Sequence, residues 1–159
     1  MAKIQMPGDY LDQTPEANPT ATEAVMNTIR TADLLFDRIG RLLRPLDVTS
    51  AGGLVLGLLR DHGPMTPSEL GERLIVTRAT VTGLLDSLER RGYVRRQPHA
   101  TDRRSLVVEL TPEGITTLQQ VRSIIHAQET AWMDAFSDAE LRRYIDVLHR
   151  IQDAVARED

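Results

Sequence analysis

The side chains most suited to chemistry in this sequence are arginines, and they are concentrated in its middle. Between residues 73 and 104 there are eight arginines against three acidic residues, a balance of +5. The residues before this block carry a balance of −4 and the residues after it −5. A protein with a net charge of −4 and one basic segment directs a positive field at an anionic partner. The alternative is an ordinary solvated face, and charge alone does not separate the two.

Other kinds of chemistry are disfavoured by the residue types. The sequence has no cysteine, which excludes disulfides, thiolate zinc sites, catalytic thiols and thiol redox sensors. His62, His99, His126 and His149 have no paired spacing with carboxylates, so we expect no metal site. Motifs of serine hydrolases, phosphate loops, dinucleotide sites and zinc proteases are missing, so we expect neither an enzyme nor a cofactor.

The composition is that of a folded protein outside the membrane. The length of 159 residues, of which 41% are hydrophobic, suits one compact domain with or without an oligomerisation appendage. No run of about 18 apolar residues could span a membrane, and the first ten residues lack the apolar stretch of a secretory signal. We therefore expect a soluble, cytoplasmic protein.

The elements that must position the arginines are predicted from apolar spacing and from helix caps. Thr66, Thr111 and Ser137 each begin a helix, because each supplies an acceptor for the orphan amides of the first turn. The predicted elements are an arm at 1–19, helices at 20–46, 49–61, 66–74, 77–91, 112–135 and 138–156, and strands at 93–97 and 106–110.

This order of elements predicts a winged helix-turn-helix. A short capped helix, a tight connection and a longer helix form the helix-turn-helix, and the hairpin that follows forms the wing. The fold class is therefore mainly α with a small β-hairpin wing (α+β). The basic block coincides with the second helix and the wing, which favours double-stranded DNA as the partner.

Within the second helix, apolar residues at helical spacing define the core face and leave polar residues outside. The outward residues at its start are Thr77, Arg78, Thr80 and Thr82. Arginine pairs bidentately with guanine, and threonine offers a hydroxyl or a methyl group. The alternative for Arg78 is a solvated residue at a helix start, although a cation there opposes the helix dipole.

Further DNA contacts are expected at the start of the first helix and in the wing. Thr66 and Ser68 lie where a helix N-terminus could hold a phosphate, although capping explains both equally well. At the wing tip, His99 and Arg103 are candidates, and an arginine there would enter the minor groove. Arg95 and Arg96 flank phosphates in this hypothesis, or are plain strand polarity.

The long helices at both ends carry apolar stripes that one winged helix cannot cover. Two copies packed through these helices would share a core and hold two recognition helices about one DNA turn apart. The alternative is that the stripes fold back within one chain. The predicted organisation is an arm (1–19), an N-terminal dimerisation helix (20–46), a DNA-binding domain (47–111) and C-terminal dimerisation helices (112–159).

Four stretches of the sequence resemble the multiple-antibiotic-resistance regulator (MarR) family: 70–74, 77–94, 102–105 and 110–114. The resemblance implies a homodimeric winged-helix transcription factor, more often a repressor, that binds pseudo-palindromic DNA and is released by a small, often aromatic ligand. It also implies that Arg104 pairs with Asp86 and locks the wing to the recognition helix. Arg103 then becomes the minor-groove residue, and the two roles could be reversed.

A ligand cavity is expected between the dimerisation helices and the DNA-binding module. Its candidate lining residues are Phe36, Trp132, Met133 and Phe136. Aromatic and methionine side chains at helical spacing are also common in ordinary cores, so a core role is the alternative. The alternative function for the whole chain is a winged-helix protein–protein interaction adaptor without DNA binding, against which the basic block argues.

Overall fold

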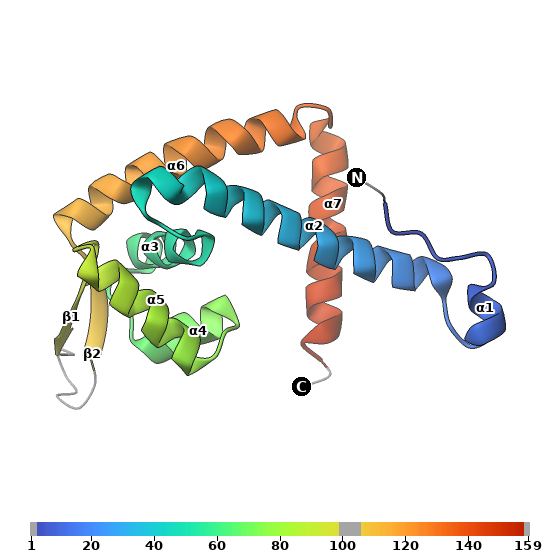
Figure 1. Cartoon of the computed structure of the whole chain (residues 1–159), viewed down its shortest axis with the longest axis horizontal. Helices are drawn as coiled ribbons and strands as arrows, with labels where there is room; N and C mark the ends of the chain where they lie inside the picture. The colour runs from blue at the N-terminus through green and yellow to red at the C-terminus, as the bar shows by residue number, and fades with distance from the viewer. Residues whose placement is uncertain (1–2, 99–105, 158–159) are drawn as a thin grey trace. The chain divides into compact units, whose positions relative to one another are not determined.

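The computed structural model describes residues 3–98 and 106–157. These ranges contain helices and one two-stranded antiparallel sheet (Figure 1). The elements are α1 (Tyr10–Gln13), α2 (Pro19–Leu43), the 3-10 helix η1 (Arg44–Leu46), α3 (Ser50–His62), α4 (Pro67–Leu74), α5 (Arg78–Arg90), β1 (Val94–Pro98), β2 (Leu106–Leu110), α6 (Pro112–Met133) and α7 (Asp138–Val155). The predicted fold class, mainly helical with a β-hairpin wing, is confirmed.

The chain divides into two compact units, Met1–Val121 and Arg122–Asp159, and the division falls inside α6. The first unit holds the helix-turn-helix, formed by α4 and α5, and the hairpin of β1 and β2. The second unit holds the end of α6 and all of α7.

The core of the first unit is built from leucine and valine side chains of several elements. Leu56 of α3, Leu70 of α4, Leu85 of α5 and Val108 of β2 are all fully buried, and these elements pack against one another. Burial of each such side chain contributes about 1.5–3 kcal/mol to stability. One shared core therefore fixes the helix-turn-helix and the hairpin together.

The three predicted helix starts are confirmed. Thr66 Oγ1 accepts a hydrogen bond from the Glu69 amide at 3.3 Å, and the Glu69 carboxylate accepts from the Thr66 amide at 2.7 Å. Ser137 and Glu140 form the same reciprocal pair at the start of α7. Thr111 Oγ1 accepts from the Gly114 amide at 3.0 Å, at the start of α6.

The hairpin is tied into the helix-turn-helix on both sides. Val94 pairs with Leu110 at one end of the ladder. Before α4, Met65 forms a bridge with Val108, with N–O distances of 2.8 and 3.0 Å. A Cβ on Gly114 would lie 1.9 Å from the carbonyl oxygen of the residue before Val94, so only glycine permits α6 to begin so close to β1.

The N-terminal arm, predicted from prolines and weak periodicity, contains one helical turn and contacts α2. The amide of Ile4 donates to Asn27 Oδ1 at 3.3 Å, and Asn27 Nδ2 donates to the Ile4 carbonyl at 2.9 Å. Met6 donates its amide to Glu23 at 2.7 Å. These bonds join residues about twenty positions apart, which local spacing does not reveal.

Two further features concern membranes and metals. Within the described ranges, no single helix is long and apolar enough to cross a membrane. By length and composition alone, one pair of helices there could do so: the segment from α2 to η1 and the following α3, which are bent by 78° relative to each other. Among the same residues, no three His, Asp or Glu side chains are grouped so that they could hold a metal ion.

Candidate nucleic-acid interface

The turn between α4 and α5 sets the geometry of the candidate interface. Ile75 ends α4 in the left-handed region, with φ 53° and ψ 49°, and the amide of Val76 returns to the Gly71 carbonyl at 3.1 Å. Gly71 is buried, and a Cβ there would lie 3.4 Å from Val81 Cγ2. The small residue lets α4 approach α5 closely, so the two helix starts lie near each other.

Helix α5 divides into the two faces that the sequence predicts. Val81, Leu85 and Leu88 are buried against the core, and Leu84 is half-buried. The exposed residues of its first two turns include Arg78, Thr80 and Thr82, and the N-cap residue Thr77 is exposed as well. The start of α5 therefore presents a polar surface to solvent.

The three threonines use their hydroxyls partly within the helix. Thr77 Oγ1 accepts from the Thr80 amide at 3.3 Å and lies 2.9 Å from Thr80 Oγ1. Thr82 Oγ1 donates to the Arg78 carbonyl at 3.0 Å. The methyl groups and the remaining oxygen lone pairs stay available at the surface.

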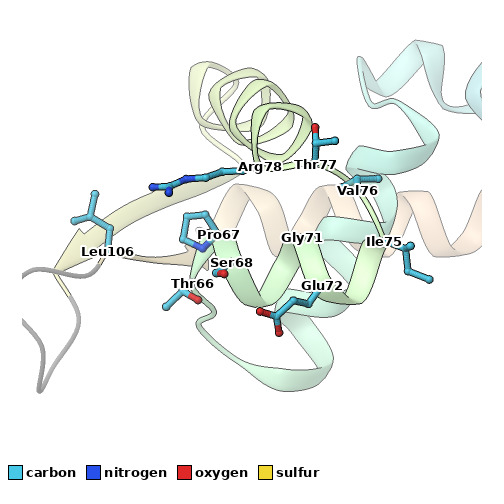
Figure 2. Close-up of a pocket in the computed structure, with 10 residues that line it drawn as sticks. All are labelled: Thr66, Pro67, Ser68, Gly71, Glu72, Ile75, Val76, Thr77, Arg78 and Leu106. Carbon is cyan, nitrogen blue, oxygen red and sulfur yellow. The ribbon is translucent and has the colours of Figure 1, made fainter. Parts of the chain in front are cut away.

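The guanidinium of Arg78 has no hydrogen-bond or ion-pair partner among the residues that the structure describes. Figure 2 shows its side chain extending from α5 toward Leu106, past Pro67 at the start of α4. These residues line an open groove of about 910 Å³, together with Thr66, Ser68 and the turn at Ile75. The groove thus combines a helix N-terminus with one arginine whose guanidinium is unpaired within the described ranges.

Several other arginines of the basic block are paired with acids. Arg91 lies 2.9 Å from Asp47, and Arg95 lies 2.5 Å from Glu109. Both acids lie outside the block in sequence. Arg95, one of the two residues predicted to flank phosphates, therefore pairs with an acid on the other strand of the hairpin. The count of arginines in the sequence thus overstates the positive charge that is available to a ligand.

The predicted partner of Asp86 was Arg104, which lies outside the described residues together with His99 and Arg103. Among the described residues, Asp86 Oδ1 accepts from Arg96 Nη2 at 2.7 Å, and a pair between Asp86 and Arg104 stays a prediction. Arg96 also pairs with Glu89. The bond from Asp86, with the nearby charge of Glu89, raises the pKa of the Arg96 guanidinium above its ordinary value. Arg96, the second residue that the sequence places at phosphates, thus binds two carboxylates of α5.

A second cavity, of about 500 Å³, lies in the first unit where the end of α2 meets the starts of η1 and α3 and the end of α5. Phe36, Asp47 and Arg91 are among its lining residues. The bond from Arg91 lowers the pKa of Asp47, and Arg91 Nε is buried with no hydrogen-bond partner in the described part of the chain.

The four predicted cavity residues are divided between the two units. Phe36 lies in the first unit, whereas Trp132, Met133 and Phe136 lie in the second. Trp132 and Met133 are half-buried, and Phe136 is exposed. A cavity lined by all four stays a prediction.

The contacts of Arg91 and Arg96 differ from those that the sequence predicts. One signal was present for Arg96, because Asp86 and Glu89 are three residues apart on a helix and so share a face that could bind a cation. The Arg91–Asp47 pair had no comparable signal, since it joins residues 44 positions apart.

Comparisons with known proteins agree with this geometry. The sequence model of the MarR family matches residues 48–106. The HTH-type transcriptional repressor YetL of Bacillus subtilis is 40% identical over 89 residues, which cover 56% of this chain and 53% of YetL. The chain therefore spans about half the length of this relative. The HTH-type transcriptional regulator PecS of Dickeya dadantii is 29% identical over 132 residues, or 80% of each chain.

Solved structures of similar fold include one with bound DNA. A mutant MarR from Escherichia coli, complexed with operator DNA, aligns with a TM-score of 0.69 and 26% sequence identity. The alignment covers 80% of this chain and 95% of that one.

Proposed function

We propose that the chain is a member of the MarR family, whose sequence model matches residues 48–106, and that it is a sequence-specific, DNA-binding regulator of transcription. In this proposal it acts as a homodimeric repressor on a pseudo-palindromic operator and is released by a small, aromatic ligand. The observation that carries the proposal is the exposed start of α5, where the Arg78 guanidinium has no partner among the described residues and lies beside the groove at α4. A B-DNA major groove is about 12 Å wide and admits one α-helix.

The DNA-contacting residues follow from this docking. The exposed residues Thr77, Arg78, Thr80 and Thr82 would face base edges and the adjoining backbone. Thr66 and Ser68, at the start of α4, would lie against a phosphate, where the helix dipole favours an anion. His99, Arg103 and Arg104 complete the proposed interface as minor-groove and backbone contacts of the wing tip.

The homodimer is supported by apolar side chains that one chain leaves exposed. On α2 these are Val25, Met26, Ile29, Leu34 and Phe36, and on α7 they are Tyr144, Ile145, Val147, Ile151 and Val155. Stripes of this kind are covered when two copies pack through the same surface. A two-fold axis would then present two α5 helices to successive major grooves of one duplex face.

The cavity at Phe36 is the proposed effector site in the first unit. Its rim carries Arg41, Arg44 and Arg91 beside one aromatic ring, a combination that suits an aromatic carboxylate. A carboxylate there would compete with Asp47 for Arg91, the residue that follows α5. Release of this pair would free the end of the recognition helix, and Trp132, Met133 and Phe136 remain candidates for the rest of the lining.

The test of DNA binding uses a duplex that the wild-type protein selects from random-sequence DNA. We expect Arg78→Ala to weaken binding to this duplex by about 1–3 kcal/mol, the usual contribution of a base-directed arginine. Wild-type affinity should fall steeply between about 50 and 200 mM salt, because several phosphates are neutralised. The control is Arg142→Ala, which removes an exposed cation from α7. An adaptor would bind no duplex at any salt concentration.

The effector proposal is tested by displacement of that duplex with benzoate-type aromatic acids. We expect release by the wild type and a markedly weaker response from Arg91→Gln. Arg90→Gln removes the neighbouring cation, whose guanidinium binds the Asp86 carbonyl, and should respond as the wild type does. Equal responses of the two variants would remove Arg91 from the effector site.

A further inference from the structure

One residue of strand β1, Arg96, makes three polar contacts with the proposed recognition helix α5, two through its side chain and one through its backbone. Arg96 Nη2 donates to Asp86 Oδ1 at 2.7 Å, and Arg96 Nη1 pairs with Glu89 Oε2. The backbone amide of Arg96 also donates to Glu89 Oε1, at 3.2 Å. The guanidinium therefore bridges two carboxylates that lie three residues apart on one face of α5.

The neighbours of Arg96 on the same strand bind elsewhere. Arg95 Nε and Gln97 Nε2 both donate to Glu109 of β2, at 2.5 and 2.6 Å. Side chains alternate along a strand, so these two residues stabilise the hairpin itself, whereas Arg96 connects the hairpin to the helix. Arg96 is also the more buried arginine, with 25% of its side chain exposed against 66% for Arg95.

The chemistry of the bridge gives it a defined geometry. A guanidinium is a rigid, planar fork whose N–H groups point in fixed directions, and it can bind two carboxylates at a set angle. The backbone bond from the same residue fixes the strand relative to Glu89 as well. Three contacts from one residue restrict both the distance and the rotation of the hairpin relative to α5.

We propose that Arg96 is a positioning residue that sets the angle between the hairpin strands and recognition helix α5, and that it acts on DNA recognition through this angle rather than through a phosphate. The inference rests on the proposed DNA-binding function. A phosphate contact by Arg96 would require the guanidinium to leave Asp86 and Glu89, and these two carboxylates would then stand unneutralised beside an anionic duplex.

The two roles are separated by variants that change the charge in opposite directions. Arg96→Gln removes a cation, and Asp86→Asn removes an anion. If Arg96 binds a phosphate, Arg96→Gln weakens binding to any duplex and reduces the slope of log affinity against log salt by about 0.9, whereas Asp86→Asn strengthens binding. If Arg96 positions the hairpin, both variants lower the ratio of affinities for the selected duplex and a scrambled one, each roughly tenfold.

Two further variants sharpen the experiment. Arg96→Lys keeps the charge but loses the fork, so we expect the affinity ratio to stay low, and restoration of the wild-type ratio would overturn the proposal. Arg95→Gln is the matched control, because it removes a cation from the adjacent position of the same strand, and its ratio should equal that of the wild type. In a doubly substituted Arg96→Gln/Asp86→Asn protein, the affinity ratio should fall no further than in Arg96→Gln alone, since both changes break the same contact between Arg96 and Asp86.

Amide hydrogen exchange of β1 and β2 provides a readout that does not depend on DNA. We expect faster exchange in Arg96→Gln than in the wild type or in Arg95→Gln, because the strands separate from α5 more often. Equal exchange in all three proteins would overturn the positioning role even if DNA binding is confirmed. Absence of any duplex preference in the wild type would instead overturn the proposed function, and the exchange rates would still decide the role of Arg96.

Discussion

The winged-helix region and the terminal helices of this chain use apolar side chains in different ways. In the winged helix, Leu70 and Leu85 are completely inaccessible to solvent. On the terminal helices, Ile29 of α2 is 52% exposed and Ile145 of α7 is 48% exposed. The helices themselves are similar in local design, since α4 and α7 begin with the same capping box.

This contrast shows that helix formation and burial are separate requirements. Caps and spacing make α7 a helix, but they supply no surface against which its apolar side chains can pack. The winged helix completes its core within one chain. The terminal helices would complete theirs only with a second surface, which in the proposed dimer is the same surface of another copy.

The largest effect is expected from a cavity in the winged-helix core. Leu85→Ala should lower the free energy of unfolding by about 2–5 kcal/mol, because the site is fully enclosed by other elements. The loss should be the same at every protein concentration when measured by urea unfolding. Leu54→Ala is the control, because Leu54 is exposed on α3, and a comparable loss there would contradict the assignment of the core.

A smaller effect, and one of a different kind, is expected on α7. Ile145→Asp should raise the dissociation constant of the dimer about thirtyfold, which corresponds to roughly 2 kcal/mol, because a charge would enter the proposed interface. Sedimentation equilibrium over a range of concentrations measures this change.

The control on α7 is Arg150→Asp, which introduces an acid at an exposed position on a different face of the helix from Ile145. It should leave the dissociation constant nearly unchanged. A wild-type protein that sediments as a monomer, or an unchanged constant in Ile145→Asp, would show that the exposed stripe has another role.

The sequence predicted well those features that depend on neighbouring residues. The boxes at Thr66 and Ser137 and the core spacing of Val81 and Leu85 are local signals, and the helices begin and pack as they indicate. The short α1 was missed because its N-cap residue, Asp9, makes no side-chain capping bond. The arm is held instead by contacts with α2.

Charge partners could not be predicted in the same way. The pairs of Arg91 with Asp47 and of Arg95 with Glu109 cross from the basic block to acids outside it. Ion pairs between elements depend on the tertiary arrangement, which periodicity does not specify. Consequently, the count of arginines indicated a candidate region but did not distinguish Arg78, whose guanidinium has no partner among the described residues, from arginines that pair with acids.

A modest gain in stability is expected in the turn of the winged helix. Ile75 is β-branched, has φ 53° and is 92% exposed, so it accepts left-handed strain without gaining burial. Ile75→Gly should raise the free energy of unfolding by about 0.5–1 kcal/mol, because relief of strain exceeds the added entropy of the unfolded chain. Val76→Gly, where φ is not positive, should instead destabilise, and thermal unfolding of both proteins checks the sign.

The smallest effect concerns the capping box of α7. The hydroxyl and amide of Ser137 bind the Glu140 carboxylate at 2.7 and 2.8 Å and lower the pKa of Glu140 below its ordinary value of 4.5. Because the folded-state pKa lies below that of the unfolded chain, the stabilisation is present above pH 4.5 and is lost as the pH falls through the folded value.

Glu140→Gln should therefore destabilise α7 slightly at pH 7, and the difference from the wild type should shrink as the solution is acidified below pH 4.5. Urea midpoints of the two proteins, taken across this range at one protein concentration, measure the change. In α7 the cap has little burial behind it, whereas the box at Thr66 is followed directly by the buried Leu70. If the difference between Glu140→Gln and the wild type did not vary with pH, the negative charge of Glu140 would not be what stabilises α7.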